Sequence, residues 1–183
     1  MRFALLGLIP VLAVACGDGD GGNDTGPSGP CDEGPATVDP GVGEFTLEVL
    51  NGGESVNMVH GPQGGWHVDT AALIGNTGDV VQIVPSLLLT ESGESIAGVG
   101  QVAETIALAA YDDEICEGNI VAIRAYVDDV QHPAPYSDHI CSLEGKEVEL
   151  TLTVTDVVTG DSGSGSVEFI LHIDPNDADL CSQ

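Results

Sequence analysis

The stretch EVELTLTVT at residues 147–155 decides the fold class of this chain of 183 residues. Polar and apolar side chains alternate along it, and the apolar positions are Val148, Leu150, Leu152 and Val154. Successive side chains of a β-strand point to opposite faces, so a period of two residues places all the apolar ones on one face. We therefore expect a strand that is buried on one side.

The next segment along the chain repeats this alternation. Within residues 166–173 the apolar positions on one face are Val167, Phe169, Leu171 and Ile173. The connection TGDSGSG at 159–165 consists of residues that favour turns. Two alternating segments joined by turn-forming residues predict a β-hairpin.

Further strands are expected on both sides of the centre of the chain, and turn signals separate them. The candidates are residues 45–50, 56–60, 66–74, 80–89, 96–102, 105–110 and 119–127. No segment has a convincing amphipathic helical pattern. Many short strands of this kind predict an all-β, antiparallel β-sandwich of immunoglobulin-like architecture, with a jelly roll as the alternative.

The N-terminal residues MRFALLGLIPVLAVAC, numbered 1–16, have a different character. Arg2 is followed by an apolar run from Phe3 to Ala15, which is shorter than the roughly 20 apolar residues of a spanning helix. Such a run suits a secretory signal. The segment Ala13-Val14-Ala15-Cys16 resembles the lipobox of bacterial lipoproteins. The resemblance implies cleavage before Cys16, a diacylglycerol on its sulfur, and acylation of the new amino terminus.

The lipoprotein resemblance implies an order for the whole chain. Residues 1–15 would be the signal peptide, 16–43 the lipidated cysteine with a flexible Gly-, Asp- and Pro-rich tether, and 44–183 a single β-sandwich domain. The protein would be held in the cell envelope by its lipid. Gly17, rather than Asp, follows the cysteine, and in enteric bacteria this favours the outer membrane.

The charge of the chain is strongly negative. Thirty acidic residues against three Lys and Arg give a formal charge of −27, which becomes −28 if Arg2 leaves with the signal. Such a surface repels nucleic acid and anionic membrane, so we exclude both as direct partners of the folded domain. The solubility that such a charge confers is a sufficient explanation for it. The protein or ligand that the domain binds is left open.

Four cysteines remain of the five in the chain if Cys16 carries lipid. An even set in an exported protein predicts two disulfides, with three possible connectivities. Cys141 and Cys181 lie at similar distances in sequence from the expected hairpin turn, so antiparallel pairing would bring them together. This favours Cys141–Cys181, and it leaves Cys31 to pair with Cys116.

The clearest candidate for chemistry is HGPQGGWH at residues 60–67. His60 and His67 stand symmetrically about a Gly/Pro loop, and opposed residues on antiparallel strands lie close enough to share a Zn²⁺ or Cu²⁺ ion. Asp69 could be a third ligand or could accept a hydrogen bond from an imidazole. The same spacing recurs at His132 and His139, so the two loops could form one site. Structural roles for these histidines, or a recognition loop without metal, are the alternatives.

The HGPQGGWH segment also resembles a stretch found in uncharacterised predicted lipoproteins of Gram-negative bacteria. No activity follows from that resemblance. A hydrolase on a β-sandwich is a remote alternative, since no nucleophile and base can be named as a pair. We therefore expect a membrane-anchored, non-enzymatic binding or structural module without catalytic residues, and metal binding is the main rival.

Overall fold

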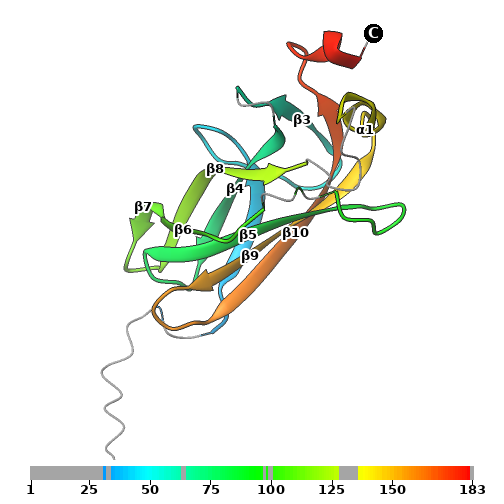
Figure 1. Ribbon diagram of the computed structural model, residues 1–183. Coiled ribbons are helices and arrows are strands. Elements are labelled where there is room, and N and C mark those ends of the chain that lie inside the picture. Colours follow the sequence, from blue (N-terminus) through cyan, green and yellow to red (C-terminus); the bar gives the residue numbers. More distant parts are fainter. Residues whose placement is uncertain are drawn as a thin grey trace, which may run out of the picture.

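A computed structural model describes residues 31, 34–62, 65–96, 98, 101–127 and 136–181 of the chain. Strands dominate these residues, and the all-β class is confirmed (Figure 1). The elements are β1 (Thr37–Val42), β2 (Glu48–Val49), β3 (Glu54–His60), β4 (Trp66–Gly75), β5 (Val80–Leu89), β6 (Glu104–Ala107), β7 (Ala109–Asp112), β8 (Glu117–Tyr126), α1 (Tyr136–Ser142), β9 (Glu147–Asp156), β10 (Ser162–Ile173) and the 3₁₀ helix η1 (Ala178–Cys181).

The predicted hairpin is present as β9 and β10, which pair antiparallel with Val148 opposite Phe169. Its alternation is confirmed: the four apolar side chains of β9 are fully buried, as are Phe169 and Leu171 of β10. The turn is shorter than expected. It lies at residues 157–160, and β10 already begins at Ser162.

Two glycines that read as turn residues therefore belong to β10, and packing explains them. A Cβ atom on Gly163 would collide with the carbonyl oxygen of Ala36, and one on Gly165 would collide with that of Val38. The absence of these two side chains lets the chain around β1 pass directly over β10. Close backbone approach is a recognised reason for glycine inside a strand.

The strands form a single curled path in the order β2-β1-β4-β3-β10-β9-β5-β6, with β8 on β4 and β7 on β8. β3 connects the two halves of this path. Its last residues, Val59 and His60, pair antiparallel with β4, whereas residues 54–58 pair with β10 in parallel. The expectation of a purely antiparallel arrangement is therefore wrong at β3–β10. The immunoglobulin-like and jelly-roll assignments stay predictions.

The hydrophobic core is built from the inward faces of both halves. Val68 and Ile74 of β4 are fully buried, as are Ile83 and Leu87 of β5, and Trp66 retains only 4% exposure. Trp66 thus anchors the core at the start of β4. Burying these side chains contributes about 25 cal/mol per Å² of apolar area removed from water.

Several expected boundaries are wrong. β1 lies inside the segment that was expected to be the tether. The sequence does not predict this strand, because Pro40 and Gly41 suggest a turn. Instead, this strand pairs with β4 over its whole length. The helix α1 was not expected either. Residues 45–50 retain only the short β2, and residues 105–110 are divided between β6 and β7.

The strand expected at 96–102 is not formed by those of its residues that the structure describes, namely 96, 98, 101 and 102. An isolated bridge joins the preceding residue, Ser95, to Leu88. Among the described residues, no helix has the length and apolar character that crossing a membrane requires.

Candidate functional site

The histidines of the HGPQGGWH segment do not face one another. His60 at the end of β3 is in register with Trp66, and Val59 is in register with His67. Because directly paired residues share a face of the sheet, His60 and His67 lie on opposite faces. The His60 and Trp66 rings have centroids 5.0 Å apart. The expected pairing of His60 with His67 is therefore wrong, because the observed register is shifted by one residue.

His67 instead associates with Asp69, as its place two residues along the same strand predicts. Nε2 of His67 lies 3.3 Å from Oδ1 of Asp69, and His67 retains 5% exposure. The ring of Tyr126, its register partner on β8, has its centroid 6.2 Å away. The carboxylate thus orients a buried imidazole against an aromatic ring, which is an arrangement suited to fixing β4 on β8.

The second histidine pair is only partly described. His139 lies on α1, and His132 lies outside the described residues. Within the described part of the chain, no group of three or more His, Cys, Asp or Glu side chains is placed to hold a metal ion. Binding of Zn²⁺ or Cu²⁺ by the full set, with His132 included, stays a prediction.

All four cysteines within the described residues form disulfides, with the pairing that the sequence favoured. Cys31 is joined to Cys116, and their Cα atoms are 5.3 Å apart. Cys141 of α1 is joined to Cys181 of η1, with Cα atoms 5.5 Å apart. The second bond holds the C-terminal 3₁₀ helix beside α1 (Figure 1). Cys16, the proposed lipid site, lies outside the described residues.

Two adjoining cavities open where the end of β5 meets the turn between α1 and β9. One has a volume of about 390 Å³ and is lined by Leu89, Thr90, Glu91, Gly145, Lys146 and Glu147. The other has a volume of about 280 Å³ and is lined by Leu89, Glu94, Ile96, His139, Ser142, Leu143 and Lys146. Leu89 and Lys146 belong to both linings. We refer to the two cavities together as the Lys146 groove.

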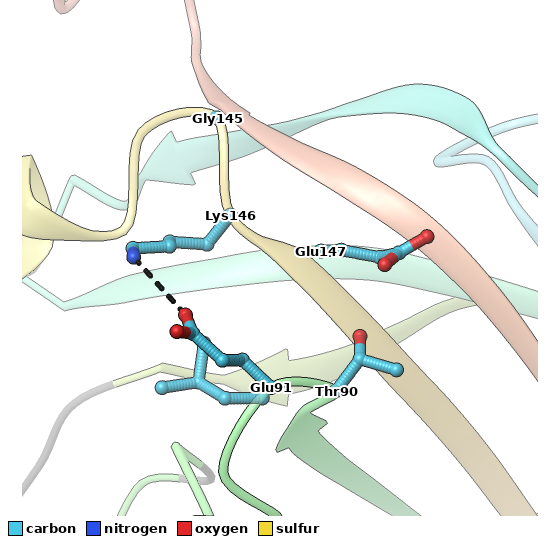
Figure 2. Close-up of a pocket in the computed structure, with 6 residues that line it drawn as sticks. Thr90, Glu91, Gly145, Lys146 and Glu147 are labelled. Atoms are coloured by element: carbon cyan, nitrogen blue, oxygen red, sulfur yellow. Dashed lines mark ion pairs between the residues drawn. The ribbon is translucent and has the colours of Figure 1, made fainter.

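Lys146 carries the positive charge of this groove. Figure 2 shows its side chain extending over the first cavity to Glu91, and Nζ lies 3.6 Å from Oε2 of that residue. Glu147 points to the other end of the same cavity, beside Thr90 (Figure 2). The Lys146 side chain retains 48% of its exposure and that of Glu91 retains 86%. Both charges are thus accessible to a molecule entering from solvent.

The backbone of the groove is held on both sides. The N–H of Gly145 donates to the carbonyl of Leu171, and the N–H of Leu171 donates to that of Lys146, each at 2.8 Å. On the opposite wall, the N–H of Thr90 donates to the carbonyl of Glu147 at 3.1 Å. Lys146 therefore projects from a turn that is fixed to two neighbouring strands.

Glu144 gives a further link between this turn and β10. Its carboxylate lies 2.7 Å from Nδ1 of His172 and accepts the backbone N–H of Ile173 at 2.6 Å. The hydrogen bond with His172, supported by that from Ile173, holds the pKa of Glu144 below its ordinary value. The carboxylate is consequently ionised at neutral pH and fastens the turn before Lys146.

Sequence reasoning missed the Lys146 groove. Its walls come from residues 89–96 and 139–147, which the pairing of Leu89 with Val148 brings together. One signal was available: the basic residues number three in the whole chain, and Lys146 is the one lysine among them.

Comparisons with known proteins provide no family for the chain. No family model matches it, and no curated protein matches it in sequence. Among solved structures, the CooA pilin subunit from enterotoxigenic Escherichia coli is similar over 76% of this chain and 99% of the pilin chain. The two chains share 13% sequence identity, and the TM-score is 0.31. A likeness this loose carries no functional argument.

Proposed function

We propose that this protein is an exported lipoprotein, anchored through Cys16, that presents a non-enzymatic all-β binding module in the cell envelope. The observation that carries the proposal is the pairing of the cysteines. Four of the five cysteines form two disulfides within the domain, and Cys16 is the one that remains. A single cysteine outside the disulfides, placed directly after an apolar signal-like run, supports Cys16 as the lipidation site.

The disulfides also support the proposed location. Such bonds form and persist in oxidising compartments and are rare in the reducing cytosol. Two acyl chains or more hold a protein firmly at a membrane, since each buried CH₂ contributes about 0.8 kcal/mol. The disulfide at Cys31 fixes the first described residue to the domain, so the chain between Cys16 and Cys31 would act as the spacer. The outer membrane is the proposed address.

The roles of the buried ionisable groups support a module that binds rather than one that catalyses. Asp156, which is 3% exposed, accepts backbone N–H groups from Gly78, Val158 and Thr159. Asp69 is paired with the imidazole of the buried His67. A general base needs to reach a substrate proton. These two carboxylates are directed at the protein's own turns and strands.

A membrane fractionation experiment tests the anchor. We expect the full chain to partition into the detergent phase and to incorporate an alkyne analogue of palmitate, and Cys16→Ala to do neither. A variant with both Cys31→Ala and Cys116→Ala is the matched control, because it removes cysteines while leaving the signal intact. Incorporation of the palmitate analogue into Cys16→Ala at the level of the unmodified chain would contradict lipid anchoring through Cys16.

A further inference from the structure

We propose that the Lys146 groove binds a free apolar α-amino acid, with the zwitterionic end at the Lys146–Glu91 pair and the apolar side chain in the adjoining cavity. This proposal does not depend on the lipid anchor, because every residue that it uses belongs to the folded domain.

The groove carries charges of both signs. A ligand with net negative charge would gain from Lys146 but would be opposed by Glu91, Glu94 and Glu147, in a chain whose formal charge is −27. A simple cation would gain from the three carboxylates but would be opposed by Lys146 at the junction of the two cavities. A zwitterion has no net charge and can satisfy both signs at once, since opposite charges attract over these short distances.

The two charges of the ion pair lie close enough together for one α-amino acid to contact both. Nζ of Lys146 and Oε2 of Glu91 are 3.6 Å apart. The ammonium and carboxylate of an α-amino acid are attached to the same carbon and lie a similarly short distance apart. The ligand can therefore place its ammonium at Glu91 and its carboxylate at Lys146. Exposed ion pairs of this kind are weak, so exchanging the protein's own partner for a ligand costs little.

The second cavity adds three apolar side chains beside this pair, those of Leu89, Ile96 and Leu143, among the polar side chains of Glu94, His139 and Ser142. Ile96 and Leu143 are 1% and 2% exposed, and Leu89 lies on the boundary shared with the first cavity. A cavity of about 280 Å³ is close to the lower end of small-ligand sites. An apolar lining with a few placed polar groups is the usual composition of such sites. A branched aliphatic side chain fits this description.

The groove is also preorganised, which reduces the cost of ordering it on binding. The turn carrying Lys146 is hydrogen-bonded to Leu171, and the N–H of Gly93 closes the opposite loop onto the carbonyl of Leu89 at 2.8 Å. Only the long side chains of Lys146 and Glu91 need to move. The ligand would therefore meet a fixed apolar floor and two adjustable charges.

The experiment titrates the full chain, purified in detergent, with L-leucine and follows binding by calorimetry and by the NMR shifts of residues 89–96 and 142–147. We expect saturable binding with a dissociation constant of about 1 mM or tighter. Three comparison ligands each lack one feature: 4-methylpentanoate lacks the ammonium, 3-methylbutylamine lacks the carboxylate, and glycine lacks the side chain. Each is expected to bind at least about tenfold more weakly than leucine.

Two substitutions test the assignment of the charges. Lys146→Gln and Glu91→Gln should each weaken leucine binding by at least about tenfold. Glu168→Gln is the matched control, because it removes one exposed carboxylate from β10 outside the groove and should leave binding unchanged. Both charged side chains in the groove are substantially exposed, so the variants should fold, and a thermal melt checks this.

Three results would overturn the proposal. The first is the absence of saturable leucine binding up to about 10 mM. The second is equal binding of 4-methylpentanoate, which would make the groove an anion site. The third is an unchanged leucine affinity of the Lys146→Gln variant, provided that this variant melts at the same temperature as the unmodified chain. Loss of membrane attachment in Cys16→Ala, by contrast, leaves leucine binding unaffected and so separates this test from that of the anchor.

Discussion

The carboxylate of Asp156 accepts a hydrogen bond from the backbone N–H of Gly78 at 2.5 Å, joining two turns that are 78 residues apart in sequence. The other carboxylate oxygen accepts the N–H groups of Val158 and Thr159 at 2.7 and 2.8 Å. One buried side chain thus closes the β9–β10 turn and ties it to the connection between β4 and β5.

Asp156→Asn should destabilise the domain by about 1–3 kcal/mol, because the amide nitrogen that replaces one oxygen cannot accept a hydrogen bond and leaves a buried partner unmatched. Urea unfolding measures the change. Asp161→Asn, at an exposed position of the same turn, serves as the control and should change stability by no more than about 0.5 kcal/mol. Equal effects of the two substitutions would contradict the role given to Asp156.

The same carboxylate should make stability depend on pH. Burial alone raises the pKa of Asp156, but the hydrogen bonds from Gly78, Thr159 and Val158 outweigh it and leave the pKa below its ordinary value. A carboxyl with a lower pKa in the folded state contributes stability above its unfolded pKa and loses that contribution as pH falls through the folded value. The stability difference between the unmodified chain and Asp156→Asn should therefore shrink below about pH 4. A difference that stays constant down to pH 2 would count against this linkage.

Gly163→Ala and Gly165→Ala should each destabilise the fold, since the added methyl group meets a carbonyl oxygen of the chain at β1. Overpacking of this kind typically costs about 1–3 kcal/mol. Ser164→Ala lies between them on an exposed position of β10 and should have little effect. The unfolding midpoints of the three variants test this prediction. A neutral result at both glycines would mean that β1 does not cross β10 as described.

His67 and His60 should respond differently to substitution, because the first is 5% exposed and the second lies at the surface. His67→Gln should lower the free energy of unfolding by about 1–3 kcal/mol through loss of the contact with Asp69. His60→Gln should change it by about 0.5 kcal/mol or less. Chemical denaturation measures both, and the opposite order of effects would show that the register of β3 on β4 is shifted by one residue.

Each disulfide should contribute several kcal/mol to stability. The bonds close loops with sequence separations of 85 and 40 residues. Loop-closure entropy then gives each bond a contribution of about 4 kcal/mol, slightly larger for Cys31–Cys116. Replacing either pair by alanines and measuring urea unfolding tests this value. Alkylation of the unfolded, unreduced chain should label none of these four cysteines, and labelling of Cys31 would contradict its pairing.

The sequence was sufficient wherever the alternation of side chains was regular. The β9–β10 hairpin and the pairing of Cys141 with Cys181 both follow from local pattern and hairpin geometry. β1 was missed because Pro40 and Gly41 suggest a turn, although pairing with β4 fixes them in an extended strand. The seven-residue α1 is too short for helical periodicity to be recognised.

The candidate sites were harder to predict than the fold, since they depend on register and on contacts between distant segments. Shifting the β3–β4 pairing by one residue moves His60 from one face to the other, and the Gly/Pro loop does not specify which register forms. The Lys146 groove exists only because β5 and β9 are neighbours in the sheet. No local sequence motif predicts that these two strands are neighbours.

The Cys31–Cys116 bond also determines how the domain would respond to mechanical force. Tension on the chain ahead of Cys31 passes through the sulfur atoms into the turn between β7 and β8, before it can reach β1. The first strand is thereby shielded from being peeled away from β4 one hydrogen bond at a time. A pull from the N-terminal side loads a covalent link, and the pairing of β1 with β4 stays outside the path of the force.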